Sequence, residues 1–511
     1  MKRTLSTLAV GLFSITAMGQ GASTPTPQWR PQYHFSPPKN WTNDPNGLIF
    51  LDGRYNLYYQ HNPFGNKWGH MSWGHAVSTD LVHWKDLPVA IPQVVAPDTT
   101  TDIFSGCAVL DKDNTSGFGA GALVAVFTAD QPKQHKESQF IAYSTDGGLR
   151  YTMYPGNPVI DLHMHDFRDP NVFWCDKAGR WVMTVAMVNE HQVRFYGSPD
   201  LKTWTRLSDF GPAGAAVNGW ECPSMLPLKT GDGKTKWVVF VSCGGGHGPM
   251  MQYFVGDFDG TTFTPDDPTP PLLTVDQGDA FYAAISWRDA PGHRMIMEGW
   301  LQNGKPETYP WKGQMSIPRD LTLRATPAGL RLMQNPTAVI ADSLDKISRG
   351  RRYDYHGALK TPIFLDQKAH LTGNAYWLDV TLDLTKATTA YIDLAYARFM
   401  SPGARPVYID GDKKVRVGYD VARREMFVDC TASEKDNKPL GNQVLRAPLE
   451  SHNGKVRLRV LFDRSSLEVF GGDGEQVIST MVYPDADATA LSLSAEGHAI
   501  VDKLRLWNLE R

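Results

Sequence analysis

A turn sequence that recurs along the first half of the chain limits its possible folds more than any other feature. Each copy follows an apolar run and precedes an aromatic residue, and the copies recur roughly every 60 residues. A repeat of this length in a chain of short strands is typical of β-propeller blades, although turn chemistry alone can also produce such a pattern. Four copies, with further strands before and after them, predict five blades. The copies are residues 78–81 before Trp84, 144–147 before Tyr151, 198–201 before Trp204 and 256–259 before Phe263.

The rest of the chain is also nearly all β, but its pattern changes after about Gln334. Residues 337–352 are polar and charged, which indicates a linker with some helix. Beyond them, strands with regular alternation of apolar and polar residues follow, as in residues 456–460 (VRLRV). We therefore expect an all-β protein, with a five-bladed β-propeller over residues 23–336 and a C-terminal β-sandwich over residues 353–511.

The first 22 residues have the pattern of an export signal. Lys2 and Arg3 precede a short apolar stretch, and small residues follow it. The alternative is a buried N-terminal strand. The stretch is too short and interrupted to cross a bilayer, and no other segment is apolar enough. We expect a signal peptide over residues 1–22, a secreted or periplasmic mature protein and no membrane partner.

The charge balance and the cysteines exclude several classes of protein. The formal net charge is −3, without a basic stripe or an acidic tail, so no nucleic-acid partner is predicted. The five cysteines are widely and irregularly spaced, which argues against a zinc site and a disulfide framework. No metal and no organic cofactor are predicted. A neutral substrate fits this balance, and the oligomeric state stays open.

Three acidic residues stand in unusual surroundings. Asp44 lies in residues 41–47 (WTNDPNG), where Pro and Asn-Gly interrupt a strand, so it is either an Asx-turn residue or a side chain presented at a strand end. The amides of Asn43 and Asn46 are expected to keep its carboxylate ionised. Asp169 follows Arg168 and precedes a proline, which favours an ionised carboxylate or a structural Arg–Asp turn.

The third acidic residue is Glu221, between Trp220 and Cys222. If its side chain shares the apolar surroundings of these neighbours, desolvation raises its pKa, as a proton donor requires. The alternative is a side chain that points to solvent from an edge strand. Two carboxyl groups facing one bond are what glycoside hydrolysis needs, and nearby aromatic residues such as Trp68 can contact sugar rings.

These motifs together resemble glycoside hydrolase family 32, the invertases, inulinases and levanases. The resemblance spans nearly the whole mature chain. It implies a five-bladed propeller with a β-sandwich, Asp44 as nucleophile, Glu221 as acid/base and Asp169 as stabiliser of the transition state. It also implies that a fructosyl subsite is lined by Asn43, Gln60, Trp68, Phe104, Ser105, Arg168 and Trp311. The matching motifs are residues 41–47 (WTNDPNG), 59–63 (YQHNP), 68–75 (WGHMSWGH), 104–107 (FSGC), 168–170 (RDP), 221–223 (ECP) and 466–470 (SLEVF).

Two positions depart from the family pattern. Cys107 replaces the last serine of the FSGS motif. Ala280 stands where relatives place an aspartate before Phe-Tyr-Ala, with Asp276 and Asp279 nearby, so it is open whether either carboxylate points into the site. The latter departure affects the rim of the pocket, where chain-length preference is set.

The sequence thus predicts a secreted, retaining, exo-acting β-fructosidase that hydrolyses terminal β-D-fructosyl residues of fructans (levan or inulin) and sucrose through a covalent fructosyl-enzyme. One alternative is a fructosyltransferase of the same family. Others are a non-catalytic fructan-binding propeller and an inverting arabinan hydrolase. Preference among sucrose, inulin and levan is left open.

Overall fold

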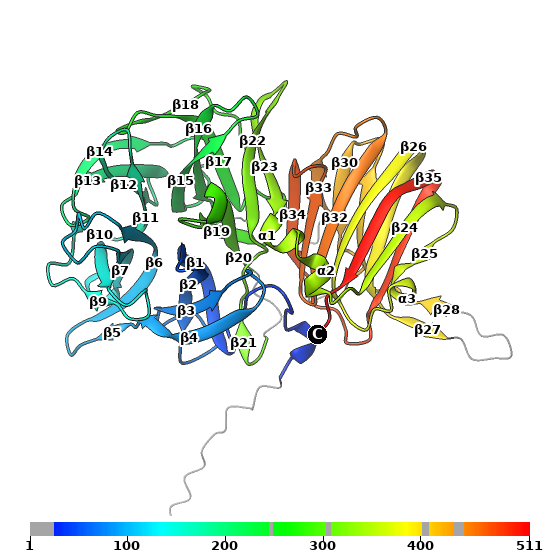
Figure 1. Cartoon of the computed structure of the whole chain (residues 1–511), viewed down its shortest axis with the longest axis horizontal. Helices are drawn as coiled ribbons and strands as arrows, with labels where there is room; N and C mark the ends of the chain where they lie inside the picture. Colours follow the sequence, from blue (N-terminus) through cyan, green and yellow to red (C-terminus); the bar gives the residue numbers. More distant parts are fainter. Residues whose placement is uncertain (1–24, 245–248, 303–307, 401–407, 434–443) are drawn as a thin grey trace, which may run out of the picture.

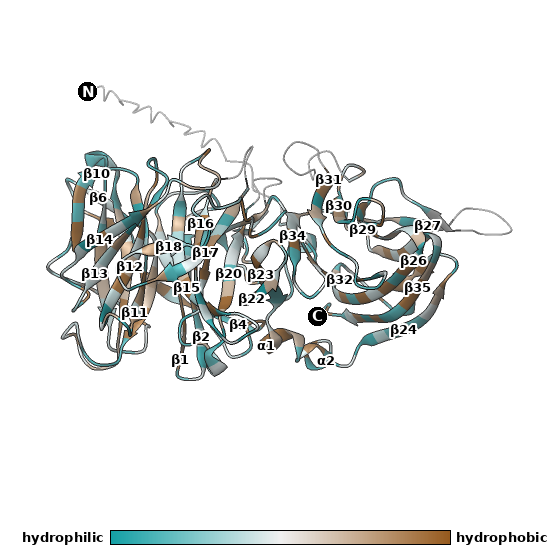
Figure 2. Cartoon of the chain, turned by 90° about the horizontal axis from the view of Figure 1, so that it is seen from above, coloured by the Kyte–Doolittle hydropathy of each residue, from teal (hydrophilic) through white to brown (hydrophobic). Residues whose placement is uncertain are grey.

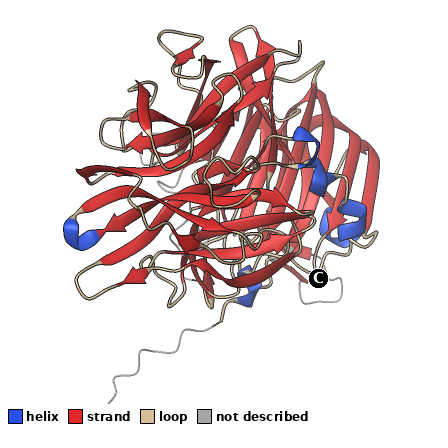
Figure 3. Cartoon of the chain, turned by 60° about the vertical axis from the view of Figure 1, so that its left-hand side comes forward, coloured by secondary structure: helices blue, strands red, loops and turns tan. Residues whose placement is uncertain are grey.

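The computed structural model describes residues 25–244, 249–302, 308–400, 408–433 and 444–511. It contains a ring of five β-sheets followed by a β-sandwich, which lie side by side in Figure 1. Strands dominate both parts, and the few helices are short (Figure 3). The predicted all-β fold, with a five-bladed propeller and a C-terminal β-sandwich, is confirmed. Within the described ranges, no helix has the length and apolar character needed to cross a membrane.

Each blade is built on four antiparallel strands, of which the first lies at the centre of the ring and the last at the rim (Figure 1). The five central strands β1, β6, β11, β15 and β19 contact one another around the ring. The strands are, in blade 1, β1 (Asn40–Leu51), β2 (Arg54–Asn62), β3 (Ser72–Ser78) and β4 (Trp84–Ile91); in blade 2, β6 (Thr100–Asp111), β7 (Ala122–Gln131), β8 (Lys136–Ser144) and β10 (Ile160–Met164), with short β5 (Val94–Val95) and β9 (Thr152–Met153) at its edges; in blade 3, β11 (Phe167–Cys175), β12 (Arg180–Met187), β13 (Gln192–Ser198) and β14 (Thr205–Phe210); in blade 4, β15 (Glu221–Lys229), β16 (Thr235–Ser242), β17 (Met251–Phe258) and β18 (Phe263–Pro265); and in blade 5, β19 (Phe281–Ser286), β20 (Ile296–Leu301), β22 (Arg319–Thr326) and β23 (Gly329–Pro336).

The repeated turn follows the third strand of each of the first four blades. In blade 1, the Ser78 hydroxyl donates to the Asp80 carboxylate, which accepts the backbone N–H groups of Val82 and His83. The same arrangement recurs at Ser144 and Asp146 and at Ser198 and Asp200 in blades 2 and 3. In blade 4, Asp259 accepts the N–H groups of Thr261 and Thr262. Where the chain reverses, the carboxylate therefore accepts backbone N–H groups in place of a carbonyl of a neighbouring strand.

The aromatic residue after each turn packs against the preceding blade where ring contacts are resolved. Tyr151 of blade 2 meets Tyr58 of blade 1 edge-on, at 5.6 Å between ring centroids. Phe263 of blade 4 meets Phe210 of blade 3 in the same way, at 5.0 Å. Trp84 of blade 1 stacks on a tryptophan of blade 5, Trp287. The spacing of the repeat therefore reflects packing, because in these three blades the aromatic side chain packs on the neighbouring blade.

A short strand closes the ring. β21 (Trp311–Lys312) leaves blade 5 and pairs in parallel with the first residues of β1, with Trp311 opposite Asn40. Blade 1 therefore holds strands from both ends of the propeller sequence. The Trp311 ring is buried, and the Arg30 guanidinium lies over it at 4.7 Å from the ring centroid.

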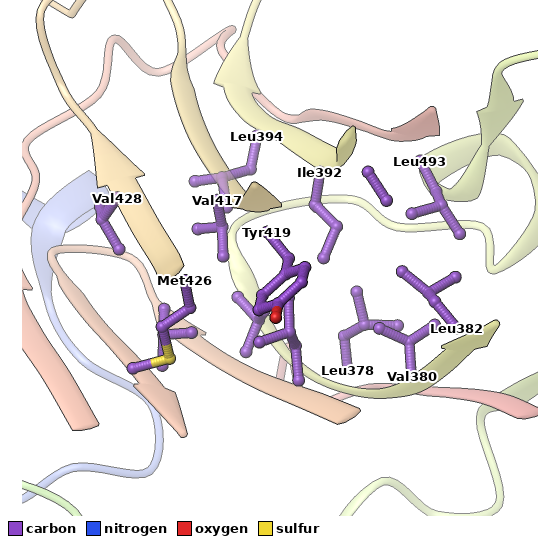
Figure 4. Packing of buried hydrophobic residues seen from close by; sticks show 14 of the residues in the cluster. Leu378, Val380, Leu382, Ile392, Leu394, Val417, Tyr419, Met426, Val428 and Leu493 are labelled. Atoms are coloured by element: carbon purple, nitrogen blue, oxygen red, sulfur yellow. The ribbon is translucent and has the colours of Figure 1, made fainter. Parts of the chain in front are cut away.

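The sandwich is built on two long strands, β26 and β35. The first half of β26 pairs with β32 and its second half with β29, whereas β35 pairs along its length. Apolar and polar residues alternate along these strands (Figure 2), and the apolar face forms the core around Leu378, Ile392 and Tyr419 (Figure 4). The strands are β24 (Arg352–Leu359), β25 (Ile363–Phe364), β26 (Ala375–Tyr396), β27 (Arg398–Met400), β28 (Tyr408–Asp410), β29 (Val415–Asp420), β30 (Glu425–Asp429), β31 (Val444–Pro448), β32 (Lys455–Asp463), β33 (Ser466–Gly471), β34 (Gln476–Met481) and β35 (Ala490–Asn508).

Short helices connect the two parts. The segment between β23 and β24 contains α1 and α2. All five cysteines are buried and unpaired. The helices are α1 (Ala338–Ala341), α2 (Leu344–Ile347) and α3 (Leu365–Lys368), with three single-turn 3₁₀ helices, η1 (Pro27–Trp29), η2 (Pro132–Gln134) and η3 (Pro291–His293).

Buried charges fix the propeller to the sandwich. His34, before the first blade, places Nδ1 2.9 Å from Asp463 and Nε2 2.9 Å from Glu468, both in the sandwich. Glu468 also binds Arg319 of blade 5 at 2.6 Å, and Arg319 lies 3.0 Å from Asp276. All five side chains are fully buried. Because each charge is paired, the network fixes one orientation of the two domains rather than leaving an uncompensated ion.

This network predicts a loss of stability in alkaline solution. Burial lowers the pKa of His34, but hydrogen bonds and charge from Asp463 and Glu468 outweigh burial and raise the pKa to about 9. A folded-state pKa above the unfolded value of about 6.5 contributes stability that is complete below that value and is lost as pH rises toward 9. We expect about 3 kcal/mol of unfolding free energy to disappear over this window. Thermal unfolding of the wild type and of His34→Gln between pH 6 and 10 measures it, and equal slopes in the two proteins would contradict the assignment.

Candidate active site

The five central strands share an irregularity at the same height. Each of them has a register shift against the second strand of its blade. The shifts lie between Thr42 and Pro45 in β1, Ile103 and Gly106 in β6, Arg168 and Asn171 in β11, Glu221 and Ser224 in β15, and Tyr282 and Ile285 in β19. Such bulges redirect side chains away from the regular alternation of a strand. Three residues within the shifts, Asp169, Cys222 and Ala283, have positive φ angles of 65°, 47° and 52°.

The bulges surround a cavity of about 400 Å³ on the axis of the propeller. This volume is in the usual range for small-molecule sites. All five blades contribute to its lining. The residues are Asn43, Asp44, Gln60, Trp68, Phe104, Ser105, Asp130, Glu137, His165, Arg168, Asp169, Glu221, Cys222, Tyr282, Trp300 and Gln302.

Asp44 is held by donors on both carboxylate oxygens. The Asn43 amide donates to Oδ1 at 3.0 Å, and the Ser105 hydroxyl donates to Oδ2 at 2.5 Å. Burial raises the pKa of Asp44 above its ordinary value, and these hydrogen bonds oppose the rise. Asn46 does not contribute as expected, because its amide donates to the Asp44 backbone carbonyl and its own oxygen accepts from Gln60.

Asp169 lies beside Asp44, with one thiol touching both. The Cys222 Sγ is 3.5 Å from Asp169 Oδ2 and 3.7 Å from Asp44 Oδ2, and the Cys222 backbone N–H donates to Asp169 at 2.9 Å. Burial raises the pKa of Asp169 to about 7, and the charges of Glu221 and Asp44 add to the effect, although Arg168 opposes it. Arg168 favours the ionised carboxylate, as expected from the sequence, but burial outweighs the guanidinium and the net direction of the pKa is upward.

Glu221 has polar surroundings, not the apolar ones expected from its sequence neighbours. Oε1 accepts from Arg168 Nε at 3.2 Å, and Oε2 accepts from the Tyr282 hydroxyl at 2.5 Å. Trp220 is turned away and donates to the Ala215 carbonyl, since neighbouring residues of an extended chain point to opposite sides. Burial and the charge of Glu221 raise the pKa of Tyr282 well above its ordinary value, so this phenol remains a hydrogen-bond donor.

The structure brings nine of the ten sequence-predicted site residues into this one cavity. Trp311 does not line it, because the closing strand β21 directs the indole toward Arg30. Asp276 and Asp279 are also absent from the lining. Asp276 instead accepts from Ser479 of the sandwich at the domain junction.

Several lining residues were not predicted from the sequence. Tyr282 belongs to the Phe-Tyr-Ala segment, which could have indicated it. Asp130 and Glu137 sit in regular strands without motif character, so only strand pairing reveals them. Of the described side chains, Asp130, Glu137 and His165 form one group able to hold a metal ion, with ligand atoms within 4.8 Å of one another. Arg168 already occupies the Glu137 carboxylate at 2.7 Å, which opposes a cation there.

Comparisons with known proteins agree with the motifs. A levanase of Bacillus subtilis is 41% identical over 502 residues, covering 94% of this chain and 71% of that protein. An extracellular exo-inulinase of Aspergillus awamori is 38% identical, covering 93% of each chain. The crystal structure of exo-inulinase from Aspergillus awamori superposes with a TM-score of 0.83 at 35% identity, covering 94% of this chain and 98% of that one.

A further solved structure and two family models match both domains of this chain. A fructofuranosidase from Schwanniomyces occidentalis, complexed with fructosylnystose, matches with a TM-score of 0.81 at 28% identity over 96% of this chain and 99% of that one. Residues 34–336 match the N-terminal domain of glycosyl hydrolases family 32, and residues 349–508 match the C-terminal domain of that family. The chain therefore belongs to glycosyl hydrolase family 32.

Proposed function

We propose that this glycoside hydrolase is a retaining, exo-acting β-fructosidase that releases terminal fructose from fructans (levan or inulin) and from sucrose. The observation that carries the proposal is the convergence of Asp44, Asp169 and Glu221 on one axial cavity. Two carboxyl groups facing one glycosidic bond are the minimum that hydrolysis with retention requires. The names of the relatives, levanase and exo-inulinase, support fructans as the substrate and chain ends as the point of attack.

In the proposed mechanism, the Asp44 carboxylate attacks the anomeric carbon of the terminal fructosyl unit. The bond to the leaving oxygen breaks as Glu221 transfers its proton to that oxygen, and a fructosyl–Asp44 ester forms. Water then attacks the same carbon, gives its proton to Glu221 and releases Asp44. In this mechanism Asp169, which contacts the same Cys222 thiol as Asp44, binds fructosyl hydroxyls and stabilises the transition state, and Tyr282 and Arg168 orient Glu221.

We further propose that the protein acts outside the cytoplasm. The signal-like residues 1–22 lie outside the described part of the chain, so the sequence pattern carries this proposal. A relative that is named extracellular supports it.

The products formed over time test the activity. The purified protein is incubated with levan, inulin and sucrose, and the products are separated by chromatography. Free fructose should appear first from each substrate. Early release of long oligofructosides would contradict exo action, and accumulation of new oligofructosides from concentrated sucrose would favour the fructosyltransferase alternative.

The hydrogen bond from Ser105 to Asp44 should set the acidic limit of activity. Asp44 must be ionised to attack, and the Ser105 hydroxyl stabilises the ionised form. Removing a hydrogen bond to a charged group costs about 1.5–3 kcal/mol, which corresponds to one to two pH units. In Ser105→Ala, the acidic limb of the kcat/KM profile should therefore move upward by about this amount. An unchanged acidic limb would show that another group sets it.

A further inference from the structure

The cavity has a second zone above the catalytic carboxylates. On β7, Thr128 accepts the Asp169 backbone N–H at 2.9 Å, and its cross-strand partner on β8, Gln139, binds the Phe167 carbonyl. Asp130 lies two residues further along β7, on the same face as Thr128 and about 6.5 Å away. Because the catalytic residues lie near the starts of the central strands and β7 runs antiparallel to β6, the end of β7 lies toward the mouth of the cavity.

Asp130 is costly to the fold at this position. It stands directly opposite Glu137 in the β7–β8 ladder, and like charges in such pairs are destabilising. Arg168 compensates Glu137 at 2.7 Å, and Glu137 also accepts the Phe167 N–H. Asp130 is only 6% exposed, and its Oδ1 is buried with no hydrogen-bond partner among the described residues. A buried acceptor without a partner that lines a cavity is suited to a ligand that brings its own donors.

We propose that Asp130 binds hydroxyl groups of the second sugar of a fructan, on the leaving-group side of the scissile bond. The inference rests on the proposed function. Glu221 must reach the glycosidic oxygen, so the leaving sugar lies on the side of Glu221 away from Asp44. Arg168 extends from Glu221 to Glu137, and Glu137 faces Asp130. A line of neighbouring side chains that starts at Asp44 and runs through Glu221 and Arg168 therefore leads to the Asp130 carboxylate.

The polar groups around Asp130 suit a sugar better than a cation. A carboxylate accepts hydrogen bonds from vicinal hydroxyls, and each such bond to a charged group is strong. The His165 ring stands nearby at the rim, where it is partly exposed. A cation would have to compete with the Arg168 guanidinium for Glu137.

Binding to an inactive enzyme tests the inference without turnover. In an Asp44→Ala background, calorimetry measures the affinities for fructose and for an inulin-type trisaccharide, with and without Asp130→Ala. We expect Asp130→Ala to weaken trisaccharide binding by about 10- to 100-fold, the value of a hydrogen bond to a charged group, and to leave fructose binding unchanged. Asp161→Asn is the matched control, since Asp161 pairs with Lys136 in the same blade and does not line the cavity.

The outcomes separate this inference from the proposed function. If Asp130→Ala weakens both ligands equally, or neither, the leaving-group role is wrong while fructoside binding stands. If the Asp44→Ala protein binds neither ligand, the proposed function fails, and the inference with it. Titrations in EDTA and with added Mn²⁺ or Ca²⁺ complete the test. Trisaccharide binding that depends on the metal would overturn direct binding by Asp130.

Discussion

Replacement of Asp44 by alanine is expected to lower kcat for every fructoside by about 10⁴-fold or more, because no fructosyl-enzyme can form. The loss should be the same for sucrose, fructans and a synthetic aryl β-fructofuranoside. A good leaving group removes the need for a proton, but it does not replace the attacking carboxylate. Single-turnover rates on the three substrates measure the effect. A much smaller loss on the aryl fructoside would indicate that Asp44 is not the nucleophile.

The shape-matched variant Asp44→Asn separates catalysis from folding. Asp44 is half-buried beside Asp169, and the charge of Glu221 adds to the rise in its pKa. Removing one of several mutually repelling carboxylates should leave the thermal unfolding midpoint unchanged or raise it. An inactive variant with a lowered midpoint would instead point to a structural role for Asp44.

The sequence predicts the fold because the blade repeat has a simple physical basis. An aspartate that accepts backbone N–H groups and an aromatic residue that packs on the neighbouring blade are local requirements, so they recur in the sequence along the first four blades. The three carboxylates are also found from sequence, because proline, glycine and asparagine beside them interrupt the strands at the bulges.

The environments of those carboxylates cannot be predicted in the same way. Glu221 takes its surroundings from Arg168 and Tyr282 on two other blades, not from Trp220 beside it. The opposition of Asp130 and Glu137 depends on the register of β7 and β8. Residue types alone do not specify these cross-strand and cross-blade distances. The charge balance in the site can therefore be assessed only from the three-dimensional structure of the propeller.

Replacement of Glu221 by alanine should have a different signature from the loss of Asp44. Cleavage of sucrose and fructans should slow by about 10²–10⁴-fold, the usual range for general acid catalysis. The first step on an aryl β-fructofuranoside should slow much less, since that leaving group needs no proton. Hydrolysis of the fructosyl-enzyme should then be slow, because the attacking water has no general base. Tyr282 and Arg168 remain in the site, but neither supplies a carboxylate that could accept the proton.

Azide turns this difference into a stereochemical test. A small anion needs no base, so azide should restore turnover of the aryl fructoside by Glu221→Ala and yield the β-fructosyl azide, because two displacements retain configuration. In Asp44→Ala, azide could act only as a substitute nucleophile, and its product would be the inverted α-azide. Identification of the azide anomer by NMR therefore assigns each carboxylate separately. If Asp44→Ala alone responds to azide and gives the β-product, the assigned roles of Asp44 and Glu221 are reversed.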